Sequence, residues 1–271
     1  MKRQLVGTLL ALLALAALGF PLYWALASSF TPEAQLYRSP ALLPHELTTA
    51  HYRALFGERD FWTPVRNSLI VAGATTLLSV ALGSVCAYAI ARLRFRGKGL
   101  TLAFILAVSM FPQISIVSPL YLMLRELRLL NTYPGLVLPY LTFAMPLAVW
   151  LLVGFFRQLP AAVEQAALMD GAGRLRILWE IVLPLSWPGI ASVAILTFLY
   201  SWNEFLFALS FTLGPERYTV PVAITLFRGQ YQVPWGQILA AAIVATLPVA
   251  AIVLVAQRRI VSGLTEGAVK G

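Results

Sequence analysis

Six runs of apolar residues, each near 20 residues long and almost free of charge, constrain this chain more than any other feature. A helix that crosses the hydrocarbon core of a bilayer needs about 20 apolar residues, because each residue advances it by about 1.5 Å. Charged residues make up 11% of the chain, whereas about a quarter is usual in soluble domains. The sequence therefore predicts an all-α, polytopic membrane protein with six transmembrane helices. The runs are 5–27, 65–91, 100–124, 135–156, 188–210 and 237–257.

The first run has two interpretations. It follows the basic start Lys2-Arg3 and contains Ala25-Leu26-Ala27, which resembles the small-residue site at which signal peptides are cleaved. The run is 23 residues long, however, whereas the apolar part of a cleaved signal peptide spans about 7–15 residues. We therefore expect a retained membrane anchor, and cleavage before Ser28 is the alternative.

Lysine and arginine are shared unevenly between alternate loops. Twelve lie on the side that carries both termini and eight on the other, and four of the twelve fall within 92–99. Basic residues resist translocation, so both termini are expected in the cytoplasm. The predicted division is a first helix with an outer loop, a five-helix core with a cytoplasmic loop at 157–187, and a cytoplasmic tail. These three parts span 1–64, 65–257 and 258–271.

The chain lacks the residues for several kinds of chemistry. The two histidines, His45 and His51, lie in a polar segment and the single cysteine, Cys86, in an apolar one, so we expect no disulfide, metal or other cofactor. Gly97-Lys98 does not fit the GxxxxGK[ST] phosphate-binding pattern. The net charge of +9 is expected to serve topology and lipid contact, since no basic soluble domain is present to bind nucleic acid. Any ATP chemistry therefore belongs to a partner, and the chain is not expected to be an enzyme.

Two features of the runs concern helix packing. Small residues at every fourth position of the second run predict a face that packs closely against protein. Prolines in three runs free backbone carbonyls, which a membrane bundle can satisfy from neighbouring helices or from a water-lined cavity. Kinked helices around a cavity suit a transporter, and simple packing kinks are the alternative. The small residues are Thr75, Ser79, Gly83, Ala87 and Ala91, and the prolines are Pro112, Pro119, Pro139, Pro146 and Pro248.

Trp202-Asn203-Glu204 brings the only charge into the fifth run. A carboxylate near the bilayer centre costs at least about 2.5–3.5 kcal/mol, so Glu204 should face protein or water. We take Asn203 and Glu204 as candidate pathway or substrate-binding residues. The alternative is that Glu204 is solvated at the outer interface, or is a structural partner of Asn203 or of another subunit.

The segment between runs four and five predicts a helix, a turn and a second helix. Ala161–Met169 is rich in alanine and leucine, with Glu164 near the positive end of the helix dipole. Asp170-Gly171-Ala172-Gly173 provides a stop and a turn, and an amphipathic stretch runs from Arg174 to Leu183. One face of the first helix is small enough to dock against another protein, and a helix lying on lipid is the alternative. That face consists of Ala162, Ala166 and Ala167.

This loop resembles the EAA loop of permease subunits of ATP-binding-cassette importers. The pattern there is EAA, three residues, Gly, nine residues, Ile, one residue, Leu-Pro. Gln165 takes the acidic position, with Glu164 directly before it, so a salt bridge of the family is not carried onto Gln165. Trp202-Asn203-Glu204-Phe205 and the tail Arg258–Gly271 are similar to stretches of maltose-type carbohydrate permeases, specifically the six-helix partner of a heterodimeric pair. The loop residues that match are Ala166, Ala167, Gly171, Ile181, Leu183 and Pro184.

The resemblance implies a type I importer permease of the bacterial inner membrane that imports a sugar. Its partners would be a second permease subunit, a cytoplasmic ATP-binding-cassette ATPase dimer, a periplasmic or extracellular solute-binding protein, the sugar and the lipid bilayer. The short loop helix would sit in a cleft of the ATPase and transmit its closure to the membrane helices. A secondary carrier or channel working alone and an intramembrane enzyme are the alternatives. The residues expected to dock the ATPase are Glu164, Gln165, Ala166, Ala167, Asp170, Gly171, Ile181, Leu183 and Pro184.

Overall fold

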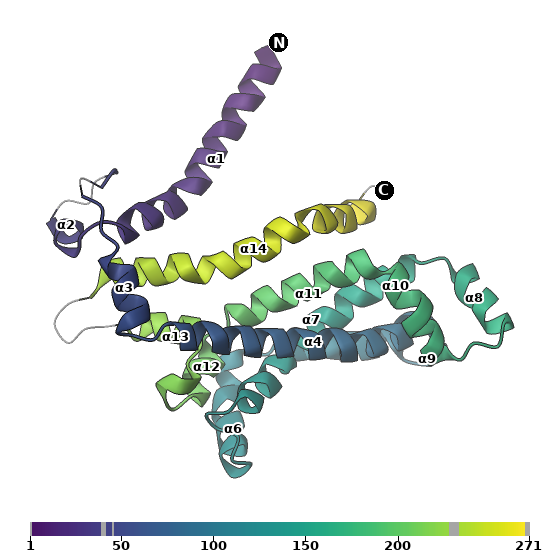
Figure 1. The fold of residues 1–271 in the computed structure, drawn as a ribbon. Helices are drawn as coiled ribbons and strands as arrows, with labels where there is room; N and C mark the ends of the chain where they lie inside the picture. Colours follow the sequence, from purple (N-terminus) through teal and green to yellow (C-terminus); the bar gives the residue numbers. More distant parts are fainter. Residues whose placement is uncertain (1, 39–41, 45, 228–232, 269–271) are drawn as a thin grey trace. The chain divides into compact units, whose positions relative to one another are not determined.

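The computed structural model describes residues 2–38, 42–44, 46–227 and 233–268, and every regular element within them is helical (Figure 1). The all-α prediction is therefore confirmed. The chain divides into two compact units. The first comprises Met1–Thr63 and Val222–Pro248, and the second comprises Pro64–Pro221 and Val249–Gly271. The predicted division into three parts stays a prediction.

The first unit joins the two ends of the chain's sequence through side-chain contacts. Glu33 Oε2 accepts the backbone N–H of Gly236 at 3.1 Å, and Arg59 Nε donates to Gln237 Oε1 at 2.6 Å. These contacts link the segments that follow α1 to the start of α14. The helices of this unit are α1 (Lys2–Ser29), α2 (Glu33–Arg38), α3 (Ala50–Gly57) and the beginning of α14 (Trp235–Ala268).

His51 is a hydrogen-bonded core residue of the first unit. It is buried, and its Nε2 lies 2.8 Å from the carbonyl oxygen of Thr31. His45 lies outside the described residues. Within the described part of the chain, no three His, Cys, Asp or Glu residues are grouped so that they could hold a metal ion.

The second unit is a helical bundle centred on α7, which packs against α5 and α11. Buried residues recur along the whole length of α7, from Gly135 to Phe156. A helix that is apolar all round is expected at the centre of a bundle. The helices are α4 (Trp62–Arg92), α5 (Lys98–Ser109), α6 (Gln113–Glu126), α7 (Tyr133–Gln158), α8 (Ala161–Met169), α9 (Arg174–Ile177), η1 (Leu178–Val182), α10 (Leu183–Leu185), α11 (Trp187–Trp202), α12 (Leu206–Phe211), η2 (Pro215–Arg217) and α13 (Val220–Thr225), which crosses the boundary between the units.

Among the described residues, four helices are long and apolar enough to span a membrane alone, namely α1, α4, α7 and α14. The third and fifth runs are not single helices, which corrects the prediction. The third consists of α5 and α6, bent by 86°. In the fifth run, α11 ends at Trp202. The angle between α11 and the preceding helical stretch, Arg174–Leu185, is 84°. Six spans result only if each bent pair counts as one, so the predicted number is not confirmed.

The prolines occupy two kinds of position. Pro112 lies in the break between α5 and α6 and is the residue directly before α6. A proline there leaves no broken helical hydrogen bond, since it precedes the helix. The others lie inside helices that continue past them, so proline marks a break at only one of the five sites. The internal prolines are Pro119 in α6, Pro139 and Pro146 in α7, and Pro248 in α14.

The predicted small-residue face of α4 is buried, and it packs against α7. A Cβ atom added at Gly83 would lie 3.5 Å from the Ala148 side chain and 3.7 Å from Val149 and Leu152. Small residues permit this approach because they keep the two helix backbones close together. Thr75, Ser79, Gly83 and Ala87 are buried and Ala91 is half-buried.

Gly135 makes a close backbone approach near the start of α7, and we expect Gly135→Ala to destabilise the protein. A Cβ atom there would lie 1.9 Å from the carbonyl oxygen of Leu129, which belongs to the backbone and cannot swing aside. Overpacking of this kind costs about 1–3 kcal/mol. The thermal unfolding midpoint of the detergent-solubilised protein should fall by about 5 °C, since each kcal/mol shifts it by about 2–4 °C. Gly154→Ala is the matched control, because a Cβ atom on Gly154 of the same helix meets nothing within 4 Å. Equal midpoints for the two variants would contradict this account.

Candidate functional site

The predicted loop helix is present with the predicted bounds, as α8 (Ala161–Met169). Gly171 ends it with φ +82°, a left-handed conformation that side-chain-bearing residues adopt only with strain. The second helical stretch runs from Arg174 to Leu185 through a π-helical turn, and so passes Pro184 instead of stopping before it. The helix–turn–helix prediction is confirmed, with a slightly longer second helix.

The two faces of α8 have different surroundings. Glu164 and Ala167 are its buried residues, with 6% and 9% of their surface exposed. The predicted docking face stays a prediction, and one of its three residues, Ala167, is packed inside the second unit. At about 100° per residue, Ala166 lies about 40° from Ala162 around the helix, whereas Ala167 lies about 140° away. The residues of α8 that face outward include Ala162, Gln165, Ala166 and Met169.

Glu164 is held by the last turns of α4. Arg92 Nε lies 2.6 Å from Glu164 Oε1, and the Tyr88 hydroxyl donates to Oε2 at 3.3 Å. Arg92 Nη2 also donates to the carbonyl oxygen of Leu159 at 2.6 Å, just before α8 begins. The expected docking role of Glu164 stays a prediction, and in the structure its carboxylate is paired within the chain. Sequence reasoning missed this contact because Arg92 was interpreted only as one of the four basic residues within 92–99 that set the topology.

The loop elements α8, α9 and α10 lie at one end of the second unit, and α6 and α12 lie toward the other (Figure 1). The loop also carries an exposed ion pair, in which Arg176 Nε donates to Glu180 Oε2 at 2.8 Å. This hydrogen bond, together with the charge of Glu180, raises the pKa of Arg176. Gln165, Ala166, Asp170, Gly171 and Pro184 are exposed, and Ile181 and Leu183 are half-buried.

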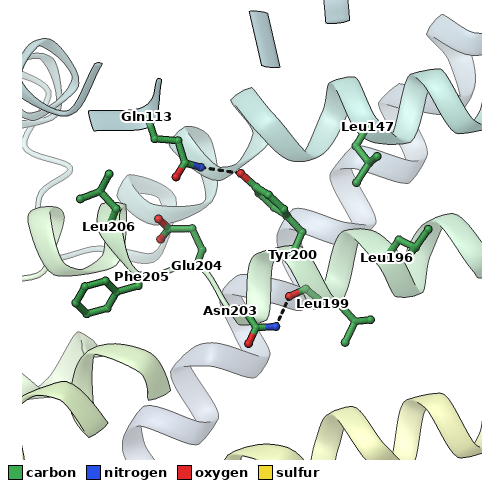
Figure 2. Close-up of a pocket in the computed structure, with 9 residues that line it drawn as sticks. All are labelled: Gln113, Leu147, Leu196, Leu199, Tyr200, Asn203, Glu204, Phe205 and Leu206. Carbon is green, nitrogen blue, oxygen red and sulfur yellow. Dashed lines mark hydrogen bonds between the residues drawn. The ribbon is translucent and has the colours of Figure 1, made fainter. Parts of the chain in front are cut away.

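A pocket of about 660 Å³ lies where the third and fifth runs are interrupted (Figure 2). Gln113, the first residue of α6, donates from Nε2 to the Tyr200 hydroxyl of α11 at 2.7 Å. Asn203 follows the end of α11, and its Nδ2 donates to the carbonyl oxygen of Leu199 at 2.8 Å. The pocket therefore combines a few hydrogen-bonding groups with an apolar wall. The nine lining residues are Gln113, Leu147, Leu196, Leu199, Tyr200, Asn203, Glu204, Phe205 and Leu206.

Glu204 lines this pocket, but its carboxylate oxygens accept hydrogen bonds from backbone N–H groups. Oε1 accepts the N–H of Phe207 at 2.8 Å, and Oε2 accepts the N–H of Ala208 at 3.1 Å. The first N–H groups of a helix have no partner within it, so Glu204 caps α12. Glu204 was expected to face protein or water, and the structure buries it in protein, since it is 7% exposed. The capping role was not among the alternatives from sequence, which treated 188–210 as one helix.

The fold and the loop together define a class: a polytopic, all-helical membrane subunit that carries a helix–turn–helix of the EAA pattern. Residues 79–266 match the family described as "Binding-protein-dependent transport system inner membrane component", and the chain belongs to this family. It is thus a multi-pass inner-membrane subunit of a transport system, and the family predicted from the loop residues is confirmed.

Relatives at high identity span nearly the whole chain. The trehalose transport system permease protein SugB of Mycobacterium tuberculosis is 44% identical over 253 residues, which is 93% of this chain and 92% of that protein. The trehalose/maltose transport system permease protein MalG of Thermococcus litoralis is 41% identical over 255 residues, 93% of this chain and 91% of that protein.

A solved structure has the same fold. It is a chain of a bacterial ABC transporter involved in the import of the acidic polysaccharide alginate, with a TM-score of 0.80 and 22% sequence identity. The match covers 95% of this chain and 96% of that chain. At this identity the comparison shows the architecture, so the predicted class of importer permease fold is confirmed.

Proposed function

We propose that this chain is the permease subunit of an ATP-driven sugar importer, in which it forms half of the translocation pathway. The observation that carries the proposal is α8, a short helix at one end of the second unit whose outward face includes Ala162 and Ala166. Relatives named for trehalose and maltose transport support a sugar as the substrate class. The chain performs no catalysis, and ATP is hydrolysed by a partner.

The outward face of α8 enters a cleft of a cytoplasmic ATPase dimer. ATP binding closes the dimer, α8 moves with it, and the membrane helices pass from an inward-facing to an outward-facing arrangement. A partner shifts such an equilibrium only by binding one state more tightly than the other. A solute-binding protein then releases sugar between this chain and a second permease subunit. Both termini lie in the cytoplasm, on the same side as α8.

The test is uptake by the purified complex in proteoliposomes, with radiolabelled trehalose and maltose as probes. Uptake should require ATP, the solute-binding protein and a hydrolysis-competent ATPase. Uptake that persists with an inactivated ATPase would support the alternative of a secondary carrier or channel instead.

The pocket at the helix breaks contributes to the sugar pathway. Sites in transporters are commonly built where membrane helices are interrupted, because backbone and polar groups are then free to meet a substrate. Tyr200 offers a ring and a hydroxyl, and Gln113 and Asn203 offer amides, which suit the faces and hydroxyl groups of a sugar. Glu204 serves the pathway by fixing the backbone that follows Asn203.

Tyr200→Phe is expected to lower the maximal uptake rate about three- to tenfold at saturating solute-binding protein. The substitution keeps the ring and removes one hydroxyl, and a hydrogen bond contributes about 0.5–1.5 kcal/mol. Tyr121→Phe on α6 is the matched control, since Tyr121 does not line the pocket. If both variants transport at the same rate, the pocket does not lie on the pathway.

A further inference from the structure

Few contacts fasten α8 to the second unit. Of its nine residues, Glu164 and Ala167 are the buried ones. Ala167 packs in the core of the unit and the half-buried Leu168 packs against that core, and the ion pair between Glu164 and Arg92 is the charged contact that holds the helix. The exposed fractions of the two side chains are 8% for Glu164 and 13% for Arg92, so the pair is largely shielded from water.

The backbone at both ends of α8 is not helical. Leu159 and Pro160 before it are extended, with ψ of 138° and 125°. Gly171 after it has a left-handed conformation. A helix between two such connections can pivot unless its side chains hold it, so the orientation of α8 depends on what its inward face touches.

Arg92 meets this requirement because it contacts two parts of the loop at once. Its Nε pairs with Glu164 at 2.6 Å, and its Nη2 donates to the carbonyl oxygen of Leu159 at 2.6 Å. The Tyr88 hydroxyl, one turn earlier on α4, reaches the second carboxylate oxygen at 3.3 Å. The guanidinium thus contributes an ion pair through one nitrogen and a hydrogen bond through another. Rotation of α8 away from α4 would leave two shielded charges without partners, which is strongly unfavourable.

We propose that the Arg92–Glu164 pair is the joint that transmits movement between α8 and α4. The inference rests on the proposed function, in which α8 is the element that the ATPase moves. Arg92 and Glu164 are positioning residues, because they face the inside of the chain and touch neither the sugar nor the ATPase. They act by making α4 follow α8.

Coupling in the reconstituted complex tests this proposal. Glu164→Gln and Arg92→Gln should each lower the number of sugar molecules imported per ATP hydrolysed at least fivefold, while the ATPase still co-purifies. The double variant should be no worse than the worse single variant, because both singles remove the same interaction. Glu180→Gln is the matched control, since it breaks an exposed pair in the same loop, and its ratio should stay at the wild-type value. A wild-type ratio for Glu164→Gln would overturn the proposal.

A distance measurement separates positioning from general stability. Spin labels at Leu82 of α4 and Met169 of α8, both exposed, are introduced into a Cys86→Ser background. Glu164→Gln should broaden the label-to-label distance distribution, and Glu180→Gln should not. If the Glu164→Gln complex does not assemble, Glu164→Asp replaces it. This variant keeps the charge but shortens the side chain, and its distance distribution is compared with that of Glu180→Gln in the same way. An unchanged distance distribution would contradict the proposal that the Arg92–Glu164 pair fixes α8 to α4. Absence of ATP-dependent uptake in the wild-type complex would instead contradict the proposed function.

Discussion

Ala166→Asp is expected to lower ATP-driven uptake about 100-fold while leaving the permease folded. Ala166 is on the outward face of α8, where a carboxylate is harmless in the free subunit. Enclosed in a cleft of the ATPase, an unpaired charge would cost about 3 kcal/mol, which is about 100-fold in affinity. The measurements are ATPase co-purification and uptake in proteoliposomes, together with the thermal unfolding midpoint of the permease.

Ala167→Asp provides the contrast to this prediction. Ala167 is one residue further along but faces the inside of the second unit, with 9% of its surface exposed. A carboxylate there would be buried in the permease itself, so the unfolding midpoint should fall. Ala166→Ser should leave both measurements near wild type. Normal uptake by Ala166→Asp would exclude the outward face of α8 as the docking surface, whatever the behaviour of Ala167→Asp.

Gly171→Val is expected to lower uptake about tenfold while Gly173→Val leaves it near wild type. A Cβ atom at either glycine meets nothing within 4 Å, so both sites have room for the first carbon of a side chain. The two sites differ in backbone conformation, since φ is +82° at Gly171 and −71° at Gly173. The left-handed conformation costs a residue with a side chain about 1–2 kcal/mol, so Gly171→Val should reorient the end of α8.

The sugar imported per ATP hydrolysed checks this prediction. Because the outward-facing residues of α8 are unchanged, Gly171→Val should still co-purify with the ATPase and hydrolyse ATP, but with less sugar moved per cycle. Equal ratios for the two valine variants would show that the turn after α8 does not need its left-handed residue for coupling.

Local features of the structure were predictable from the sequence. The bounds of α8 followed from helix propensity and a glycine turn, and the buried stripe of α4 followed from helical periodicity. Both depend on residues close together in the chain. The family followed from six loop residues at fixed spacing, and it is confirmed over residues 79–266.

Features that depend on distant residues were not predictable. Hydropathy reports the preference for lipid and is the same for a straight helix and a broken one, so the interruptions at Met110–Pro112 and after Trp202 were missed. The capping role of Glu204 was missed with the second of them. The pairing of Arg92 with Glu164 joins two elements that only the tertiary fold brings together.

Photo-crosslinking from α8 in the assembled transporter tests the central claim most directly. A benzoyl-phenylalanine at Met169, whose side chain is 88% exposed, replaces one bulky apolar group by another. The same probe at Leu213, exposed in the loop after α12, is the control. We predict a crosslink to the ATPase from Met169 and none from Leu213. No crosslink from Met169 in a complex that still hydrolyses ATP and imports sugar would contradict the assignment of α8 as the element that the ATPase moves.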